Sequence, residues 1–206
     1  MMKRMADIDA KRNLRKEYQR IRKRHKAALV ERVARIVLGP SVMRVFAEGT
    51  REKLCPVLAK TDVHKLRSVR NQHAFSEWFD RNVEIVWRTI MTLNRDRNSI
   101  WPGWKWGHST KIMALFARDM VLCTHYYSRR DSERLAPFLY VPVDGIVMKR
   151  LKKLKVRLPY SRIREIDTRA KFYSVQNLLG EAASSVGVPR VWFDDNWATV
   201  DNDGPR

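Results

Sequence analysis

Cysteine is scarce in this chain of 206 residues, which contains only Cys55 and Cys123. A zinc site or an iron–sulfur cluster with four cysteine ligands is therefore excluded within one chain. A scaffold held together by several disulfides is excluded too, and so low a cysteine content is typical of a reducing compartment. We therefore expect a protein of the cytoplasm, associated with the nucleoid, or of the nucleus, and not a secreted one.

Long hydrophobic runs are also missing. The longest, such as Ile112–Phe116, are far too short to cross a bilayer. The first ten residues are charged and lack the apolar segment of a signal peptide. We expect neither a membrane partner nor export.

Glycine and proline are rare, with eight residues of each, and alternating β-branched runs are few. This composition predicts an all-α protein. We expect helices over residues 6–37, from Thr50, over 73–93, over 109–124, from Pro142 and over 168–186. The helix at 73–93 is the strongest, because apolar residues recur there at steps of three and four, namely Phe75, Trp78, Phe79, Val83, Val86, Trp87, Ile90 and Leu93.

The domain organisation follows from the same patterns. We expect a basic helical segment at residues 1–38, with an imperfect apolar stripe of Leu14, Tyr18, Ile21, Leu29, Val33 and Ile36. Gly39 and Pro40 should end this helix. One helical domain should follow at residues 39–200, with a fraying tail at 201–206.

Acidic residues are outnumbered, because 42 Lys and Arg stand against 22 Asp and Glu and give a net charge of +20. Two blocks hold most of the excess: residues 1–36 carry 13 basic and 4 acidic residues, and residues 145–171 carry 10 and 2. Such patterning indicates a polyanionic partner, nucleic acid before an anionic membrane surface, although either block could also be a solvated helix face.

Two segments carry residues suited to chemistry, Trp106–Phe116 and Tyr140–Met148. In the first, a turn at Gly107, Ser109 and Thr110 leads into a helix with Lys111 in its first turn. The unpaired N–H groups of a helix start could hold a phosphate, and their field favours a neutral, nucleophilic amine. In the second, Asp144 follows an extended stretch and begins a helix. A carboxylate there could stabilise an oxocarbenium-like sugar, or could simply cap the helix.

These residues resemble the helix-hairpin-helix DNA glycosylase superfamily. Its 8-oxoguanine glycosylases carry Pro-Gly-Val-Gly-Thr-Lys and then Val-Pro-Val-Asp, where this chain has Trp106-Gly-His-Ser-Thr-Lys111 and Val141-Pro-Val-Asp144. The separation of 33 residues between lysine and aspartate is similar to that of the archaeal 8-oxoguanine branch. The chain departs from the family where Ser109 replaces the second glycine of the hairpin and where Ile146 replaces a histidine of the eukaryotic enzyme.

The resemblance implies a helical bundle with a catalytic cleft. It implies that Lys111 attacks C1′ of the damaged nucleoside and forms a Schiff base, that Asp144 assists departure of the base, and that the hairpin residues Gly107, Ser109 and Thr110 grip a DNA phosphate. We expect Lys149 and Arg150, in the basic block after Asp144, to hold further phosphates. The partner would be double-stranded DNA with a modified base, an oxidised purine by default, bound by a monomer without metal or cofactor.

A glycosylase must stack the flipped base between apolar or aromatic faces. The candidates for this base pocket are aromatic residues that could equally belong to an ordinary core: Trp104, Trp106, Phe138, Tyr140 and Trp192. Gln176 and Asn177 could read a base edge or be surface residues. Two alternatives to a repair glycosylase stay open: a base-modification or phage-related defence enzyme with the same Lys111 and Asp144, and a DNA-binding protein without catalysis.

Overall fold

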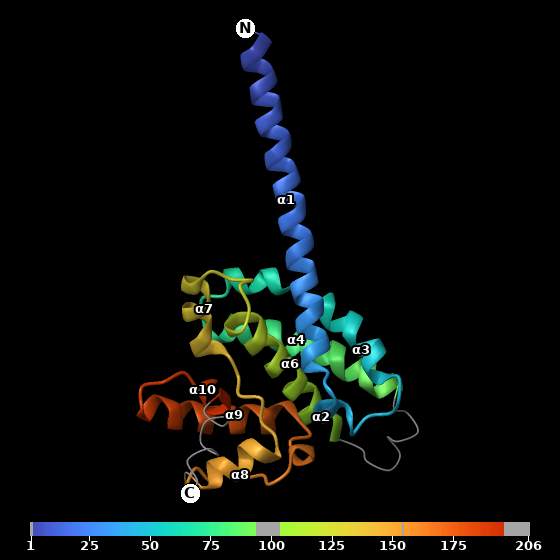
Figure 1. Ribbon diagram of the computed structural model, residues 1–206. Helices are drawn as coiled ribbons and strands as arrows, with labels where there is room; N and C mark the ends of the chain where they lie inside the picture. The colour runs from blue at the N-terminus through green and yellow to red at the C-terminus, as the bar shows by residue number, and fades with distance from the viewer. Residues whose placement is uncertain (1, 94–103, 154, 196–206) are drawn as a thin grey trace, which may run out of the picture.

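A computed structural model of the chain describes residues 2–93, 104–153 and 155–195, and every regular element in these ranges is helical (Figure 1). The prediction of an all-α protein is confirmed. The elements are, in order, α1 (Met2–Val37), α2 (Pro40–Met43), α3 (Thr50–Ala59), η1 (Val63–Ser68), α4 (Gln72–Leu93), α6 (Trp104–Leu122), α7 (Arg129–Leu135), η2 (Ala136–Phe138), α8 (Gly145–Lys153), η3 (Ile163–Glu165), α9 (Arg169–Ser185) and α10 (Trp192–Asp195). None of the helices in these ranges is both long and apolar enough to cross a lipid bilayer. The predicted tail at 201–206 lies outside the described residues.

Helices α4 and α6 pack against each other at the centre of the body, with α3, α7 and α9 around them (Figure 1). Helix α4 begins after Asn71, whose Oδ1 accepts a hydrogen bond from the amide of Ala74 at 2.8 Å. Its buried residues are those of the predicted stripe, including Phe75, Phe79, Val83, Val86 and Ile90. The helix predicted at 73–93 is therefore confirmed, and its apolar face is the middle of the core.

Helix α1 has two parts that differ in their surroundings. From residue 12 to residue 28 its side chains are exposed, apart from a half-buried Lys26, and in Figure 1 this part stands away from the body. Its last turns enter the core through Val30, Val33, Ala34 and Val37, against α3 and α6. Leu14, Tyr18, Ile21 and Ile36 are exposed, so the predicted apolar stripe is wrong except at Leu29 and Val33.

The helix ends follow the predicted signals in part. Helix α1 ends before Gly39, and Pro40 is the first residue of α2, as expected. Thr168 caps α9 by accepting from the amide of Lys171 at 3.3 Å. Thr50, however, is the first residue of α3 and not its cap, which is Gly49 at a φ of 77°. The helix predicted from Pro142 starts at Gly145, because residues 142–144 belong to no regular element.

Candidate active site

Lys111 on α6 and Asp144 before α8 meet although 33 residues separate them. Lys111 Nζ donates a hydrogen bond of 2.9 Å to Asp144 Oδ2. Both side chains stay accessible, with 17 % of the lysine and 24 % of the aspartate exposed. The two residues to which the resemblance gives catalytic roles are therefore in direct contact, and both keep part of their side-chain surface exposed.

Asp144 is the N-cap of α8. Its Oδ1 accepts hydrogen bonds of 2.9 Å from the amides of Ile146 and Val147, which have no partner inside the helix. Burial raises the pKa of Asp144, but the positive charge of Lys111 and the hydrogen bonds to the ionised form outweigh burial and bring the pKa below its usual value. The carboxylate is therefore held as an anion, with one oxygen on the helix and the other on the lysine.

Two residues of the C-terminal half hold the segment that leads to Asp144. Gln176 on α9 accepts from the amide of Val141 at 3.0 Å and donates to the carbonyl of the same residue at 2.8 Å. Arg190 Nε donates to the carbonyl of Leu139 at 3.1 Å. The extended stretch before Asp144 thus gains in α9 and Arg190 the hydrogen-bond partners that a neighbouring strand would supply.

Sequence reasoning missed the role of Gln176. Its side chain is fully buried and both its polar atoms serve Val141, so the idea that it reads a base edge is wrong. The signal was present, because Gln176 shares the apolar face of α9 with Phe172, Val175 and Leu179. A polar residue on a buried face needs internal partners. Asn177, the other candidate, is exposed.

The predicted phosphate-binding turn is wrong. Helix α6 starts at Trp104, so Gly107, Ser109 and Thr110 lie within the helix, and all three are buried. A Cβ on residue 107 would lie 2.3 Å from the carbonyl oxygen of Ile163, which shows how tightly η3 covers this turn. Thr110 Oγ1 donates to the carbonyl of Gly107 at 2.9 Å. These residues support packing, and Lys111 lies about two turns inside the helix, beyond the field of its first turn.

The two basic residues predicted after Asp144 lie on α8. Lys149 is exposed and Arg150 is half-buried, on the helix that Asp144 caps. Arg150, Lys152 and Lys153 form the basic last turn of this helix. These residues lie in the C-terminal half of α8, away from the end that Asp144 caps, and their contact with DNA phosphate stays a prediction.

The predicted pocket aromatics whose side chains are described do not gather in one place. Tyr140 is a core residue, because its ring contacts Phe75, Phe79 and Phe172 and its hydroxyl lies 2.6 Å from Ser76 Oγ. It is only 2 % exposed, so its predicted place in a base pocket is wrong.

The remaining candidates lie on different elements. Trp106 on α6 packs edge-on against Trp87, with ring centroids 6.1 Å apart. Phe138 is half-buried in η2, and Trp192 is exposed on α10. No ring contact joins Trp106, Phe138 and Trp192 within the described part of the chain. The side chain of Trp104 lies outside the described residues.

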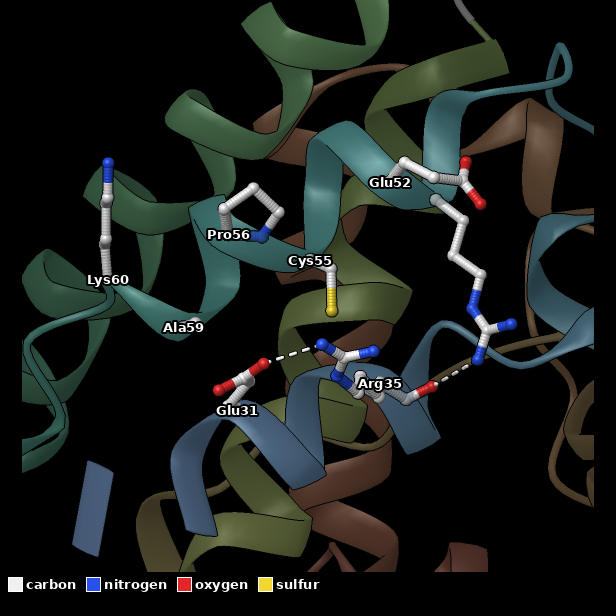
Figure 2. A pocket seen from close by; sticks show the side chains of 8 residues that line it. Glu31, Arg35, Glu52, Cys55, Pro56, Ala59 and Lys60 are labelled. Atoms are coloured by element: carbon white, nitrogen blue, oxygen red, sulfur yellow. Dashed lines mark hydrogen bonds and ion pairs between the residues drawn. The ribbon is translucent and has the colours of Figure 1, made fainter. Parts of the chain in front are cut away.

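A hollow of about 600 Å³ lies between α1 and α3, and Figure 2 shows the side chains around it. Its charges neutralise one another: Arg35 donates to Glu31 at 2.7 Å, and Arg51 donates to the carbonyl of Arg35 at 3.2 Å. Neither Lys111 nor Asp144 lines it. The Lys111–Asp144 pair, and not this hollow, is therefore the candidate active site.

No metal centre is assigned. In residues 2–93, 104–153 and 155–195, no three histidine, cysteine or carboxylate side chains come together as a metal site requires. Comparison with known proteins returns no match: no protein-family model, no curated protein and no solved structure is similar to this chain.

Proposed function

We propose that this protein is a DNA N-glycosylase with β-lyase activity, in which Lys111 is the nucleophile and Asp144 its partner. The observation that carries the proposal is the contact of 2.9 Å between Lys111 Nζ and Asp144 Oδ2 in an accessible position at the start of α8. An amine beside a fixed carboxylate is the arrangement that covalent glycosylase chemistry needs. The fold proposed with it is related to that of the helix-hairpin-helix glycosylases, but without a phosphate-binding hairpin at residues 107–110, which belong to α6.

The chemical roles follow from the charges of the pair. The bond between C1′ and the base breaks, and the base leaves with the bonding electrons. The proton that Lys111 gives up passes to the departing base through Asp144, and the free amine forms the new bond to C1′. Opening of the sugar ring then produces a Schiff base, from which β-elimination breaks the C3′–O bond. Once it has passed this proton on, Asp144 is an anion again, and it then stabilises the positive charge on the sugar.

The basic surface of α8 supports a DNA substrate. Four basic residues follow Asp144 within the helix that it caps, namely Lys149, Arg150, Lys152 and Lys153. Phosphates on both sides of a flipped nucleotide are held by cations, which these residues could supply. Specificity for an oxidised purine, action as a monomer and independence from metal or cofactor are part of the same proposal.

Borohydride trapping tests the chemistry directly. The protein is incubated with duplex oligonucleotides that carry 8-oxoguanine or one of a panel of other modified bases, and borohydride then reduces any Schiff base to a stable amine. We expect a covalent protein–DNA adduct that is lost in Lys111→Gln. Lys60→Gln is the matched control, since Lys60 is exposed near α3 and loses the same charge.

Each other outcome contradicts part of the proposal. Base release without an adduct would make the enzyme monofunctional and remove the nucleophilic role of Lys111. An adduct that persists in Lys111→Gln would assign the nucleophile elsewhere. Salt-dependent DNA binding with neither base release nor adduct across the panel would leave a DNA-binding protein without glycosylase activity.

A further inference from the structure

A cationic groove lies at the base of the exposed part of α1, where this helix passes η1 and the segment after α6. It consists of two adjoining hollows of about 420 and 400 Å³. Both are lined by Arg22, Lys26 and Arg67. We call this feature the α1 groove, and its remaining walls include Lys23, His25, His64, His125 and Tyr126.

The cations of the α1 groove are held in place. Lys26 Nζ lies 5.0 Å from the centre of the Tyr126 ring. Tyr126 is itself buried, and its hydroxyl lies 2.9 Å from His64 Nε2. Arg67 reaches the carbonyl of Tyr126 at 3.5 Å. Three elements are therefore joined around one tyrosine, and their cations point to the same space, which lowers the entropic cost of binding an anion.

The positive charge of the α1 groove is poorly compensated. Four Lys and Arg residues line it against one carboxylate, Asp131. Asp131 already binds Arg134 at 3.2 Å and Ser128 at 2.8 Å. Burial, together with the charges of Arg67 and Arg22, lowers the pKa of Lys26, as expected where cations crowd without an anion. An anion in the groove would relieve this repulsion.

The charge continues beyond the groove along α1. Between residues 12 and 26 the helix carries eight Lys and Arg residues and one acidic residue, Glu17. Arg15 and Gln19 precede Arg22 and Lys26 at helical steps of three and four, so they lie on the face that leads into the groove. The row from Arg15 to Lys26 spans about 17 Å at 1.5 Å per residue. An extended polyanion fits a row of this length better than a single free phosphate does.

The α1 groove is distinct from the proposed active site. It lies beyond the C-terminal end of α6, since His125 and Tyr126 follow Leu122, whereas Lys111 lies in the N-terminal half of that helix. The separation along α6 is about 17 Å at 1.5 Å per residue. This is about five base-pair steps of 3.4 Å, too far for contact with the nucleotide at Lys111.

We propose that the α1 groove, built on Arg22, Lys26 and Arg67, is a second binding site for the phosphate backbone of duplex DNA, remote from Lys111. The choice of DNA as the polyanion rests on the proposed function, while the site itself rests on the groove. Its role is to bind DNA without regard to sequence. The cations of the groove lie too far from Lys111 to contact the bases of the nucleotide held there, and phosphate contacts carry no sequence information.

The test is binding of unmodified duplex DNA as a function of salt concentration. We expect the triple variant Arg22→Gln, Lys26→Gln, Arg67→Gln to bind about tenfold more weakly or worse. We also expect the slope of log affinity against log salt to fall by about 2 to 3 in magnitude, near 0.9 for each lost phosphate contact. The matched control removes three exposed cations that do not line the groove, with Arg20→Gln, Arg24→Gln and Lys60→Gln. Arg22→Lys with Arg67→Lys should retain most of the affinity.

Thermal unfolding first checks that both triple variants are folded. Equal losses of DNA affinity in the two would overturn the groove as a site and leave only an effect of general charge. Competition by polyglutamate as effective as that of DNA at equal charge would overturn the nucleic-acid assignment in favour of an acidic protein. Neither readout needs catalysis, so failure of the borohydride test with a groove effect intact rejects the glycosylase and keeps the groove. Successful trapping together with equal DNA binding by both triple variants keeps the glycosylase and rejects the groove.

Discussion

Asp144 binds two helices, each through a different carboxylate oxygen. Its Oδ2 accepts a hydrogen bond from Lys111 on α6, and its Oδ1 accepts from the amides at the start of α8. The same carboxylate therefore holds a local helix end and a long-range contact. Lys111→Gln removes the partner of Oδ2 and leaves the hydrogen bonds to Oδ1 in place, so it separates the long-range contact from the helix cap.

A double-mutant cycle on Lys111 and Asp144 measures their coupling. We expect Asp144→Asn to lower the free energy of unfolding by about 1 to 2 kcal/mol, because the cap weakens and a half-buried lysine loses its counter-charge. We expect the coupling energy with Lys111→Gln to be about 1 kcal/mol in urea unfolding. Additive effects of the two changes would show that the contact contributes no stability.

The pH dependence of stability should report the same carboxylate. Since the pKa of Asp144 is lower in the folded protein than in the unfolded chain, its contribution is present above the unfolded pKa, near pH 4, and is lost as the pH falls through the folded pKa. We expect the stability difference between the wild-type protein and Asp144→Asn to shrink from pH 6 to pH 3. Chemical denaturation at several pH values measures it, and a difference that grows toward low pH would contradict the assignment.

Gly107→Ala and Gly145→Ala form a matched pair with opposite expected signs. A Cβ at residue 107 would lie 2.3 Å from the carbonyl of Ile163 and 2.9 Å from that of Ile166, so η3 must move. We expect a loss of about 2 to 3 kcal/mol. At Gly145 in the first turn of α8 a Cβ meets nothing within 4 Å, and we expect a gain of about 0.5 kcal/mol from helix propensity. Thermal unfolding of both variants decides, and equal stability of the two would contradict the packing of η3 on α6.

Gln176→Ala and Asn177→Ala compare two neighbouring amide residues on α9. Removal of Gln176 leaves the amide of Val141 buried without a partner and takes one of two donors from its carbonyl, which keeps the amide of Val143, so we expect a loss of about 1 to 3 kcal/mol. Asn177 is exposed, and its change should stay within about 0.5 kcal/mol. We also expect slower borohydride trapping in Gln176→Ala at a temperature where it is folded. A trapping rate equal to that of the wild-type protein would mean that Gln176 does not position Asp144.

The elements that could be predicted from sequence are those with strong local signals. Helix α4 was predicted to within one residue at its start because eight apolar residues keep one face, and α9 because Thr168 caps it. The start of α6 was misplaced by several residues because Gly107 reads as a turn residue. Glycine is present there because η3 leaves no room for a side chain, and that contact joins residues more than fifty positions apart.

The candidate site divides in the same way. Its two reacting groups could be predicted, since Lys111 and Asp144 lie in short motifs with a recognisable order. What holds them could not, because Gln176 and Arg190 act on the main chain of residues 139–141, and hydrogen bonds to main-chain atoms leave no mark on the sequence of their partner. The hairpin assignment failed for a similar reason, because a Ser-Thr pair before a lysine is compatible with a turn and with the interior of a helix. Only the burial of Ser109 and Thr110 in the structure distinguishes these two alternatives.

The exposed part of α1 has a consequence for how the molecule diffuses. Residues 12–28 extend about 25 Å as a helix at 1.5 Å per residue, while Val30, Val33 and Ala34 fix its inner end in the core (Figure 1). Rod and body must therefore reorient together, which makes rotation about axes perpendicular to α1 slow compared with that of a sphere of equal mass. The field of a charged surface exerts a torque on the basic helix and thereby turns the whole molecule. The body is therefore oriented toward that surface before the two come into contact.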